Sequence, residues 1–238
     1  MTEKIMEQKE NHTVFTIFPT PVYKTNWKTE NSEDLLKSWE MTQKDIRDIL
    51  KEELREFSDR TGTRLDYRSE NCYLFDDRLK KLKEFIELHI KQYVKKIWNP
   101  KEDLDFYIST SWLNVIKPGG SIHLHSHSNS IISGSFYAKT VEEDRVSFHD
   151  PNLKRRLSNS CIEITSSVQS QEPVMPYSEN VQMVDIGVND YDLLLFPSWL
   201  EHSVTPNEMA TQDRFSISFN VFARGMFGDS NSLSRLKI

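Results

Sequence analysis

The chain of 238 residues has little cysteine, no excess of basic residues and no long apolar run. Its two cysteines, Cys72 and Cys161, stand far apart, so no disulfide framework is expected and a reducing cytoplasm is the predicted location. No apolar run approaches the ~18 residues of a membrane-spanning helix, and the polar N-terminus lacks the apolar core of a signal peptide. We therefore expect no membrane as a partner.

The charge balance also argues against nucleic acid as a partner. The net charge is −6, and no long basic stretch offers a broad face for phosphates. The short run Lys154-Arg155-Arg156 is interpreted as part of a solvated loop. The length fits one sizeable domain, alone or with a helical annex, and it leaves the oligomeric state open.

The first half of the chain predicts an edge strand followed by helices. Residues 13–23 are β-rich and interrupted by prolines, which favours a strand at a sheet edge. Apolar residues at helical spacing from Leu35 to Phe57 predict one long helix or two, and a similar stripe predicts another over residues 78–98. His89 lies on the apolar side of that helix, where a packed, hydrogen-bonded histidine is expected rather than a metal ligand.

From about residue 105 the pattern changes to short β-rich segments. The predicted strands are residues 106–116, 131–140, 146–149, 162–168, 181–186, 193–196 and 215–222. In the last of them apolar residues alternate with a polar row of Arg214, Ser216, Ser218 and Asn220, which suits the interior of a small barrel that holds a ligand. Residues 154–180 are polar and without a clear pattern, as expected of a long loop that could cover a site.

Histidines supply the chemistry that this sequence suggests. His123, His125 and His127 alternate, so in an extended strand they would project from one face, and His202 follows 75 residues after His127. Neutral imidazoles suit iron, zinc, copper and nickel. Arg214 begins a strand 12 residues after His202, where its guanidinium could hold a carboxylate through two hydrogen bonds. A metal together with a carboxylate clamp suggests an oxygenase with a keto-acid cosubstrate.

Three blocks of sequence carry a resemblance to a known family. They are Ser111-Trp112-Leu113-Asn114-Val115 with Pro118-Gly119-Gly120; the segment from His125 through Tyr137 with Phe148-His149-Asp150-Pro151; and the segment from Phe196 to His202 with residues 204–207 and Arg214 to Asn220. Together these blocks resemble the non-haem iron(II), 2-oxoglutarate-dependent oxygenases, in the prolyl-hydroxylase-like superfamily, and within them a group common in marine bacteria and phages. The resemblance covers residues 13–222.

The resemblance implies an α+β fold: a double-stranded β-helix, or cupin-like jelly roll, with flanking N-terminal α-helices. Residues 1–12 are expected to be a loose N-terminus and residues 13–238 a single oxygenase domain. Within that domain the expected parts are an edge strand and helical support over residues 13–104, the double-stranded β-helix core over residues 105–222 and a C-terminal tail over residues 223–238.

The resemblance also implies a metal site. In the superfamily the first ligand follows the turn glycine by about six residues, which from Gly119 is His125. The second ligand, two residues further on, is usually Asp or Glu, and here that position is His127. The third ligand matches His202. The metal is expected to be Fe(II), with dioxygen as the other reactant.

A histidine in place of the usual carboxylate leaves three alternatives open. The site could be a three-histidine centre of His125, His127 and His202, which is the favoured set. The carboxylate could come from elsewhere, with Asp150 as the candidate. The ligand frame could also be shifted, with His123 and His125 as ligands and His127 outside the ligand set.

The cosubstrate residues are likewise carried over by resemblance. Arg214 matches the basic residue that binds the distal carboxylate of 2-oxoglutarate, and Ser216 matches the hydroxyl that assists it. Tyr137, on the strand after the first ligand, is expected to hydrogen-bond the same carboxylate, and Asn114 completes the set.

The expected activity is a 2-oxoglutarate- and Fe(II)-dependent dioxygenase that hydroxylates a protein residue, such as a prolyl residue, or a small molecule, with release of succinate and CO2. It would act in the cytoplasm, including that of a phage-infected bacterium. Two alternatives remain: a cupin-like three-histidine dioxygenase without a keto-acid cosubstrate, and a non-catalytic metal-binding jelly roll. The substrate is not readable from the sequence.

Overall fold

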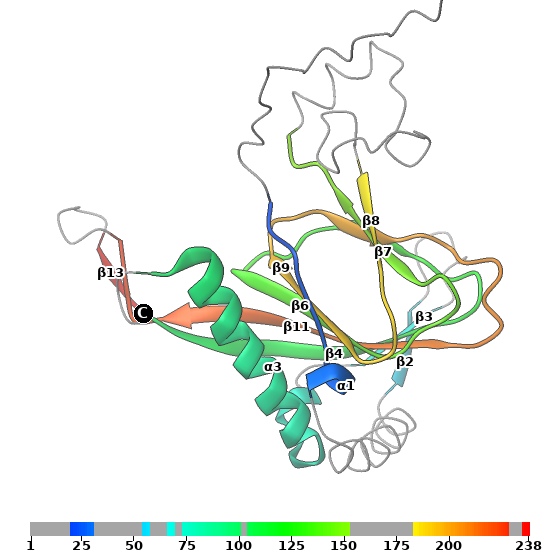
Figure 1. The fold of residues 1–238 in the computed structure, drawn as a ribbon, viewed down its shortest axis with the longest axis horizontal. Coiled ribbons are helices and arrows are strands. Elements are labelled where there is room, and N and C mark those ends of the chain that lie inside the picture. Colours follow the sequence, from blue (N-terminus) through cyan, green and yellow to red (C-terminus); the bar gives the residue numbers. More distant parts are fainter. Residues whose placement is uncertain are drawn as a thin grey trace, which may run out of the picture.

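The computed structural model describes residues 20–30, 54–57, 66–69, 73–100, 104–152, 183–228 and 235–238. Within these ranges the chain forms two antiparallel sheets that face each other, with a long helix on the outside of the larger one (Figure 1). The larger sheet has the order β1-β9-β6-β11-β4-β3-β2, and the smaller has the order β5-β10-β7-β8. This architecture confirms the expected double-stranded β-helix.

The strands of the larger sheet are β1 (Tyr23–Asn26), β2 (Leu54–Phe57), β3 (Asp66–Ser69), β4 (Asp105–Ile116), β6 (Ile132–Lys139), β9 (Asp192–Pro197) and β11 (Arg214–Arg224). Those of the smaller sheet are β5 (Ile122–His125), β7 (Arg145–His149), β8 (Met183–Gly187) and β10 (His202–Val204). Between β4 and β11 the chain crosses from sheet to sheet at every connection except that from β7 to β8. Residues distant in sequence therefore line one interior.

Strand β11 shows how the sequence pattern builds this arrangement. Its apolar residues Ile217, Phe219 and Val221 belong to the core beneath the helix. Its polar residues alternate with them, yet Arg214, Ser216 and Ser218 are also buried. Because successive side chains in a strand point to opposite faces, these polar residues face the space between the sheets. The expected polar barrel interior is confirmed.

Helix α3 (Lys80–Tyr93) covers the outer face of the larger sheet, as expected for residues 78–98 (Figure 1). Its buried residues Leu82, Phe85, Ile86 and Ile90 join one core with the outward side chains of the sheet. The helix continues through the π-turn η3 (Val94–Trp98) and ends at Asn99, which adopts a left-handed conformation with φ 42°.

Two short 3-10 turns, η1 (Tyr73–Phe75) and η2 (Asp77–Leu79), lead into α3. His89 is fully buried on the helix, and its Nδ1 lies 2.8 Å from the hydroxyl of Tyr23. The expectation of a packed, hydrogen-bonded histidine at this position is confirmed. A second hydrophobic core, separate from the one beneath α3, lies between the two sheets. It includes Phe148 and Phe196, whose rings are in edge-to-face contact.

Some expectations for the ends of the domain were wrong. Residues 54–57 were expected to be helical but form β2, because pairing with β3 outweighs the helical spacing of Leu54 and Phe57. The short helix α1 (Trp27–Glu30) follows β1, and in the C-terminal segment β12 (Met226–Phe227) pairs with β13 (Leu236–Lys237).

Several expectations fall outside the described residues: the strand segment before residue 20, the helical stripe from residue 35 to residue 53, the strand at 162–168 and the loop at 154–180. Both cysteines and the basic run at residues 154–156 lie outside them as well. Among the residues that are described, no helix is long and apolar enough to span a membrane.

Candidate metal and cosubstrate site

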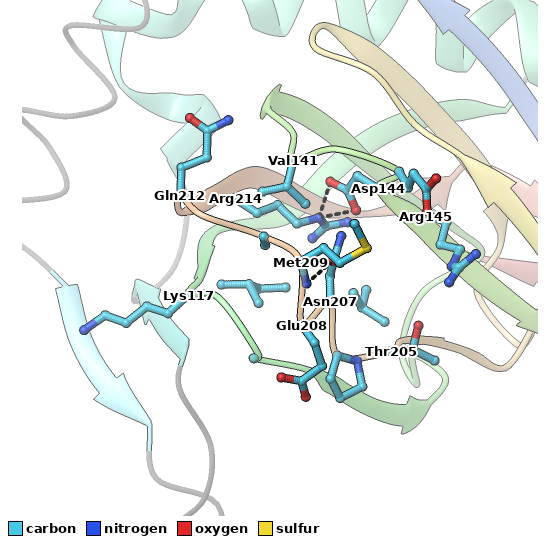
Figure 2. Close-up of a pocket in the computed structure, with 16 residues that line it drawn as sticks. Lys117, Val141, Asp144, Arg145, Thr205, Asn207, Glu208, Met209, Gln212 and Arg214 are labelled. Carbon is cyan, nitrogen blue, oxygen red and sulfur yellow. Dashed lines mark hydrogen bonds and ion pairs between the residues drawn. The ribbon is translucent and has the colours of Figure 1, made fainter.

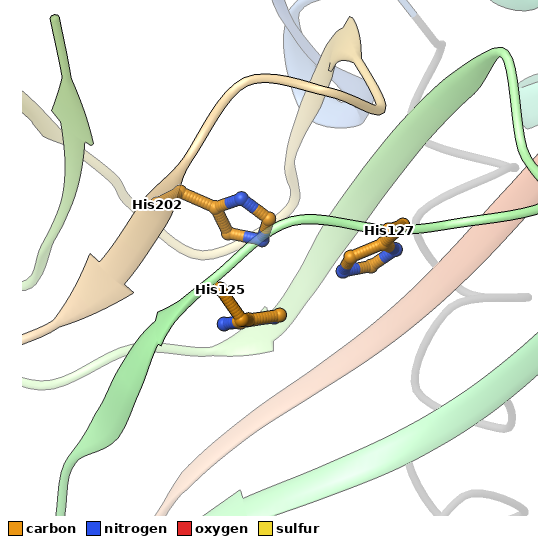
Figure 3. Close-up of side chains that lie close together, drawn as sticks. All are labelled: His125, His127 and His202. Atoms are coloured by element: carbon orange, nitrogen blue, oxygen red, sulfur yellow. The ribbon is translucent and has the colours of Figure 1, made fainter. Parts of the chain in front are cut away.

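Three histidines meet at one end of the space between the sheets (Figure 3). His125 ends β5, His127 follows in the connection to β6, and His202 begins β10. One ligand atom from each lies within 4.8 Å of the other two. Pairing of β5 with β10 places His125 directly opposite His202, which explains how residues 77 positions apart come together.

Hydrogen bonds fix which ring nitrogen of two of these histidines carries the proton. Nδ1 of His125 lies 2.8 Å from the carbonyl oxygen of His123, and Nδ1 of His202 lies 2.9 Å from that of Leu200. A carbonyl oxygen only accepts, so each Nδ1 must donate. The lone pair of each neutral ring is then on Nε2, as is usual for a histidine that binds a metal through that atom.

His127 is held by side chains rather than by the backbone. Its Nδ1 lies 2.6 Å from Oδ1 of Asn220 on β11 and 3.1 Å from the hydroxyl of Ser133 on β6. Ser133 also donates to Asn220 Oδ1 and lies 2.9 Å from the hydroxyl of Ser198, which donates to Ser130. This network gives His127 the same protonated Nδ1 as the other two histidines.

Burial keeps the third histidine neutral. The pKa of His202 is lowered to about 3, chiefly because burial disfavours the charged imidazolium and further because His125 is close. A neutral imidazole is the form that binds a metal ion. Three neutral nitrogens grouped in this way fit iron(II), zinc or another divalent transition metal, with no carboxylate among them.

The alternative ligands lie elsewhere. His123 is exposed; its carbonyl oxygen accepts the hydrogen bond from Nδ1 of His125, and the centres of the two rings are 5.4 Å apart. Asp150 is buried just after β7, where its Oδ1 accepts a hydrogen bond from the backbone N–H of Asn152. Of the described residues, the group close enough to share one metal ion contains neither of them. The geometry favours His125, His127 and His202 over the other two sets.

Arg214 begins β11 and is buried with an acidic partner that the sequence did not suggest. Its Nε donates to both carboxylate oxygens of Asp144, at 2.9 and 2.7 Å. The guanidinium also lies over the ring of Tyr137, 5.0 Å from the ring centre. Burial raises the pKa of Tyr137 to about 12, so its phenol is protonated at neutral pH. Burial also raises the pKa of Asp144, against the lowering effect of Arg214.

The other expected cosubstrate residues lie on neighbouring strands between these two ends. Ser216 on β11 pairs with Asn114 on β4 and with Tyr137 on β6, so the three form one row across the sheet. Asn114 donates to the hydroxyl of Ser218, which lies 2.9 Å from that of Ser135. The polar row of β11 thus connects the histidine end, at Asn220, to Arg214.

A cavity of about 250 Å³ opens at the Arg214 end (Figure 2). Arg214, Asp144, Lys117, Asn207 and Met209 are among its lining residues, and they come from the ends of β4 and β11 and from the loops after β6 and β10. Because Arg214 is one of the lining residues, its side chain borders this cavity, whereas the three histidines do not line it.

Sequence reasoning missed Asp144 and Asn220, although it placed Asn220 in the polar row of its strand. Both hold a predicted site residue through contacts between distant segments. Asp144 also stands outside the three blocks that carry the family resemblance. Trp199 is 54% exposed, three residues before His202.

The fold and the site define a class: double-stranded β-helix proteins with a candidate mononuclear metal site at one end of the barrel. Residues 110–220, which carry all three histidines and Arg214, match the family described as "Putative 2OG-Fe(II) oxygenase". The match covers just under half of the chain, and the family is described as using 2-oxoglutarate (2OG) and iron(II). The comparison with curated proteins gave no match.

Solved structures share the fold. A prolyl-4-hydroxylase from Pseudomonas putida is 13% identical with a TM-score of 0.52, covering 84% of this chain and 92% of its own. A prolyl hydroxylase from Trichoplax adhaerens, in complex with a hypoxia inducible factor peptide fragment, is 14% identical with a TM-score of 0.54, covering 84% and 83%. The alpha-ketoglutarate-dependent carbocyclase SnoK from nogalamycin biosynthesis is 12% identical with a TM-score of 0.55, covering 85% and 80%. At these identities the likeness concerns the fold alone.

Proposed function

We propose that this protein is a hydroxylase that uses iron(II), 2-oxoglutarate and dioxygen, with His125, His127 and His202 as the metal ligands. The observation that carries the proposal is the group of three histidine ligand atoms within 4.8 Å of one another, inside a barrel of the matching family. Three protein ligands leave room at the metal for a chelating cosubstrate and dioxygen.

Bound iron(II) would supply the activation of dioxygen, with one oxygen atom entering succinate and the other entering the substrate. The chain's own residues bind and orient the reactants. His125 and His202 are held through backbone carbonyls and His127 through Asn220, so the three rings are oriented before a metal arrives.

Arg214 is proposed to bind the distal carboxylate of 2-oxoglutarate. Its hydrogen bonds to Asp144 use Nε, and its side chain also bonds Tyr137, so the remaining N–H groups of its two terminal nitrogens can serve another carboxylate. Ser216, Tyr137 and Asn114 are proposed to line the same subsite, since they form one row of the sheet beside Arg214. Burial of this row excludes water from the charged pair and strengthens it.

The substrate class stays a choice between a protein residue and a small molecule. The fold occurs in a peptide-bound prolyl hydroxylase and in a carbocyclase of a biosynthetic route, so the barrel itself favours neither. The cytoplasm remains the proposed location, because two widely separated cysteines do not suggest an oxidising compartment.

The test is stoichiometric turnover with purified full-length protein, iron(II) and 2-oxoglutarate in air, together with a screen of prolyl peptides and small molecules. We expect oxygen consumption and succinate formation to require both iron and 2-oxoglutarate and to disappear in the His202→Ala variant. Failure to form succinate under any condition, with iron bound, would contradict the proposal.

A second candidate is a three-histidine dioxygenase that needs no keto acid. It is supported by one specific observation: three neutral ligands stand where the family usually has a carboxylate among them. In that case Arg214 would hold a carboxylate of the substrate itself. Oxygen consumption that depends on iron and substrate but not on 2-oxoglutarate would favour this candidate.

A further inference from the structure

A buried carboxylate stands beside the guanidinium proposed to bind the cosubstrate. Both oxygens of Asp144 accept hydrogen bonds from Nε of Arg214, and the two side chains are only 3% and 5% exposed (Figure 2). An ion pair between a carboxylate and an arginine at the surface would contribute little to the stability of the protein. A buried pair is different, because loss of either partner leaves a desolvated charge without compensation.

Asp144 is itself held firmly by the backbone around it. Its N–H donates to the carbonyl of Val141 in the turn that follows β6, and its carbonyl accepts from the N–H of Val188 after β8. Thus the turn after β6 and the segment after β8 both fix its position. The carboxylate of Asp144 in turn fixes the Nε edge of the Arg214 guanidinium, so the two terminal nitrogens point away from Asp144.

We infer that Asp144 is a positioning residue for the cosubstrate: it orients Arg214 so that the terminal nitrogens of the guanidinium meet the distal carboxylate of 2-oxoglutarate. This inference rests on the proposed function. It adds to that function a residue outside the three blocks of sequence that resemble the family.

The charges of the two ends of the site are consistent with this role. With three neutral histidines, the two positive charges of iron(II) are balanced by the two negative charges of 2-oxoglutarate. Arg214 then needs a negative partner of its own, and Asp144 supplies it. The group of candidate metal ligands thus contains no carboxylate, whereas Arg214 has one beside it, and with iron(II) and 2-oxoglutarate bound these groups carry no surplus buried charge.

The experiment compares two keto acids on full-length iron(II)-loaded protein without oxygen, in wild type, Asp144→Ala and Asp144→Asn. The probes are 2-oxoglutarate and 2-oxobutyrate, which has the same chelating group but lacks the distal carboxylate. Alanine removes the orienting acceptor and should weaken 2-oxoglutarate binding about tenfold, the effect of losing a charge-assisted hydrogen bond. Asparagine keeps one acceptor and should weaken it about threefold.

Binding of 2-oxobutyrate should be unchanged in both variants, a selectivity that a merely structural role would not produce. Glu142→Gln is the matched control, because Glu142 is an exposed carboxylate in the same turn and does not line the cavity. It should bind both acids as wild type does. If Asp144→Ala does not fold, the asparagine variant alone decides.

The inference is overturned if the alanine or the asparagine variant binds 2-oxoglutarate as tightly as wild type or more tightly. It is also overturned if the two keto acids are weakened equally. Arg214→Gln separates this failure from failure of the proposed function. If Arg214→Gln weakens 2-oxoglutarate and Asp144→Ala does not, only the role of Asp144 is lost; if neither does, the proposed carboxylate clamp is wrong.

Discussion

Nδ1 of His127 lies 2.6 Å from Oδ1 of Asn220, although the two residues are 93 positions apart. The amide oxygen only accepts, so the histidine donates and its other nitrogen keeps the lone pair. Asn220 thereby accepts the hydrogen bond from Nδ1 of His127 and orients its ring, as backbone carbonyls do for His125 and His202. His127 is therefore held in the form whose Nε2 lone pair could bind a metal, at the position where the resemblance predicts a carboxylate.

Replacing Asn220 should weaken metal binding. In Asn220→Ala the ring of His127 loses its main acceptor, and we expect iron(II) affinity to fall about 10- to 100-fold, as for other residues that orient a metal ligand. The measurement is a competition titration of the apo-protein against a chelator. Ser109→Ala is the control, because the Ser109 hydroxyl donates to the carbonyl of Asn220 and not to His127. Equal affinity in both variants would contradict the orienting role.

The three ligand alternatives make different predictions. His127→Ala should abolish tight iron binding, because one of three ligands is lost, whereas His127→Asp should retain it, since a carboxylate is the usual ligand at this position. His123→Ala and Asp150→Asn should bind iron as wild type does. The same chelator competition decides among them. Loss of iron binding in His123→Ala would restore the shifted frame, and loss in Asp150→Asn would restore the acidic ligand.

Changing Arg214 should separate cosubstrate binding from metal binding. Arg214→Gln removes the proposed charged donors, and we expect the KM for 2-oxoglutarate to rise on the order of 100-fold while iron affinity is unchanged. The same change leaves Asp144 buried without its cation, which costs about 3–5 kcal/mol of stability. Unfolding must therefore be measured beside the kinetics, and an unchanged KM in the folded variant would contradict the clamp.

The stability of the protein should fall at alkaline pH. Burial raises the pKa of Tyr137 from 10.0 to about 12, so above pH 10 the unfolded chain loses this proton while the folded chain keeps it. The contribution of the Tyr137 phenol to the free energy of unfolding is fully present below pH 10 and is lost as pH rises to about 12. Denaturant unfolding in this range should show the decline.

Tyr137→Phe tests the cause of that decline. The variant should lose stability less steeply over the same range, although not with zero slope, because burial also raises the pKa of Tyr93 to about 12. An identical slope in wild type and variant would show that the phenol of Tyr137 is not responsible.

Gly134 is a position where any side chain should damage the barrel. An added Cβ would lie 2.8 Å from the carbonyl oxygen of Leu194 on β9 and would overlap the ring of Phe219 on β11. Overpacking of this kind costs about 1–3 kcal/mol, and more where backbone must move. We expect Gly134→Ala to lower the unfolding free energy by at least that amount in denaturant titration. Gly187→Ala serves as the matched control and should unfold nearly as wild type does, because an added Cβ would lie 4.0 Å from its nearest neighbour, the carbonyl oxygen of Asp144.

Much of the barrel could be predicted from local sequence pattern. Strand β11 alternates apolar and polar residues, and β9 is a short apolar run, so both patterns identify strands without knowledge of their partners. The histidine group was also predictable, because His125 and His127 are close in sequence and His202 directly follows a predicted strand. Family resemblance supplied the pairing of these distant segments.

Other features could not be predicted, since they depend on contacts between distant residues. Leu54–Phe57 has the spacing of a helix but forms a strand, because β3 offers it a partner edge. Asp144 lies 70 positions from Arg214, and nothing in its local sequence distinguishes it from the acidic residues around it. Its importance follows only from burial beside the guanidinium.

The measurement that tests the central claim most directly is an anaerobic titration of the apo-protein with iron(II) and then with 2-oxoglutarate, followed by visible absorption. We expect a weak metal-to-ligand charge-transfer band that appears only when both are present and is absent in His202→Ala. Iron that binds without producing the band on addition of 2-oxoglutarate would contradict chelation at this site, and a protein that binds no iron would contradict the metal centre itself.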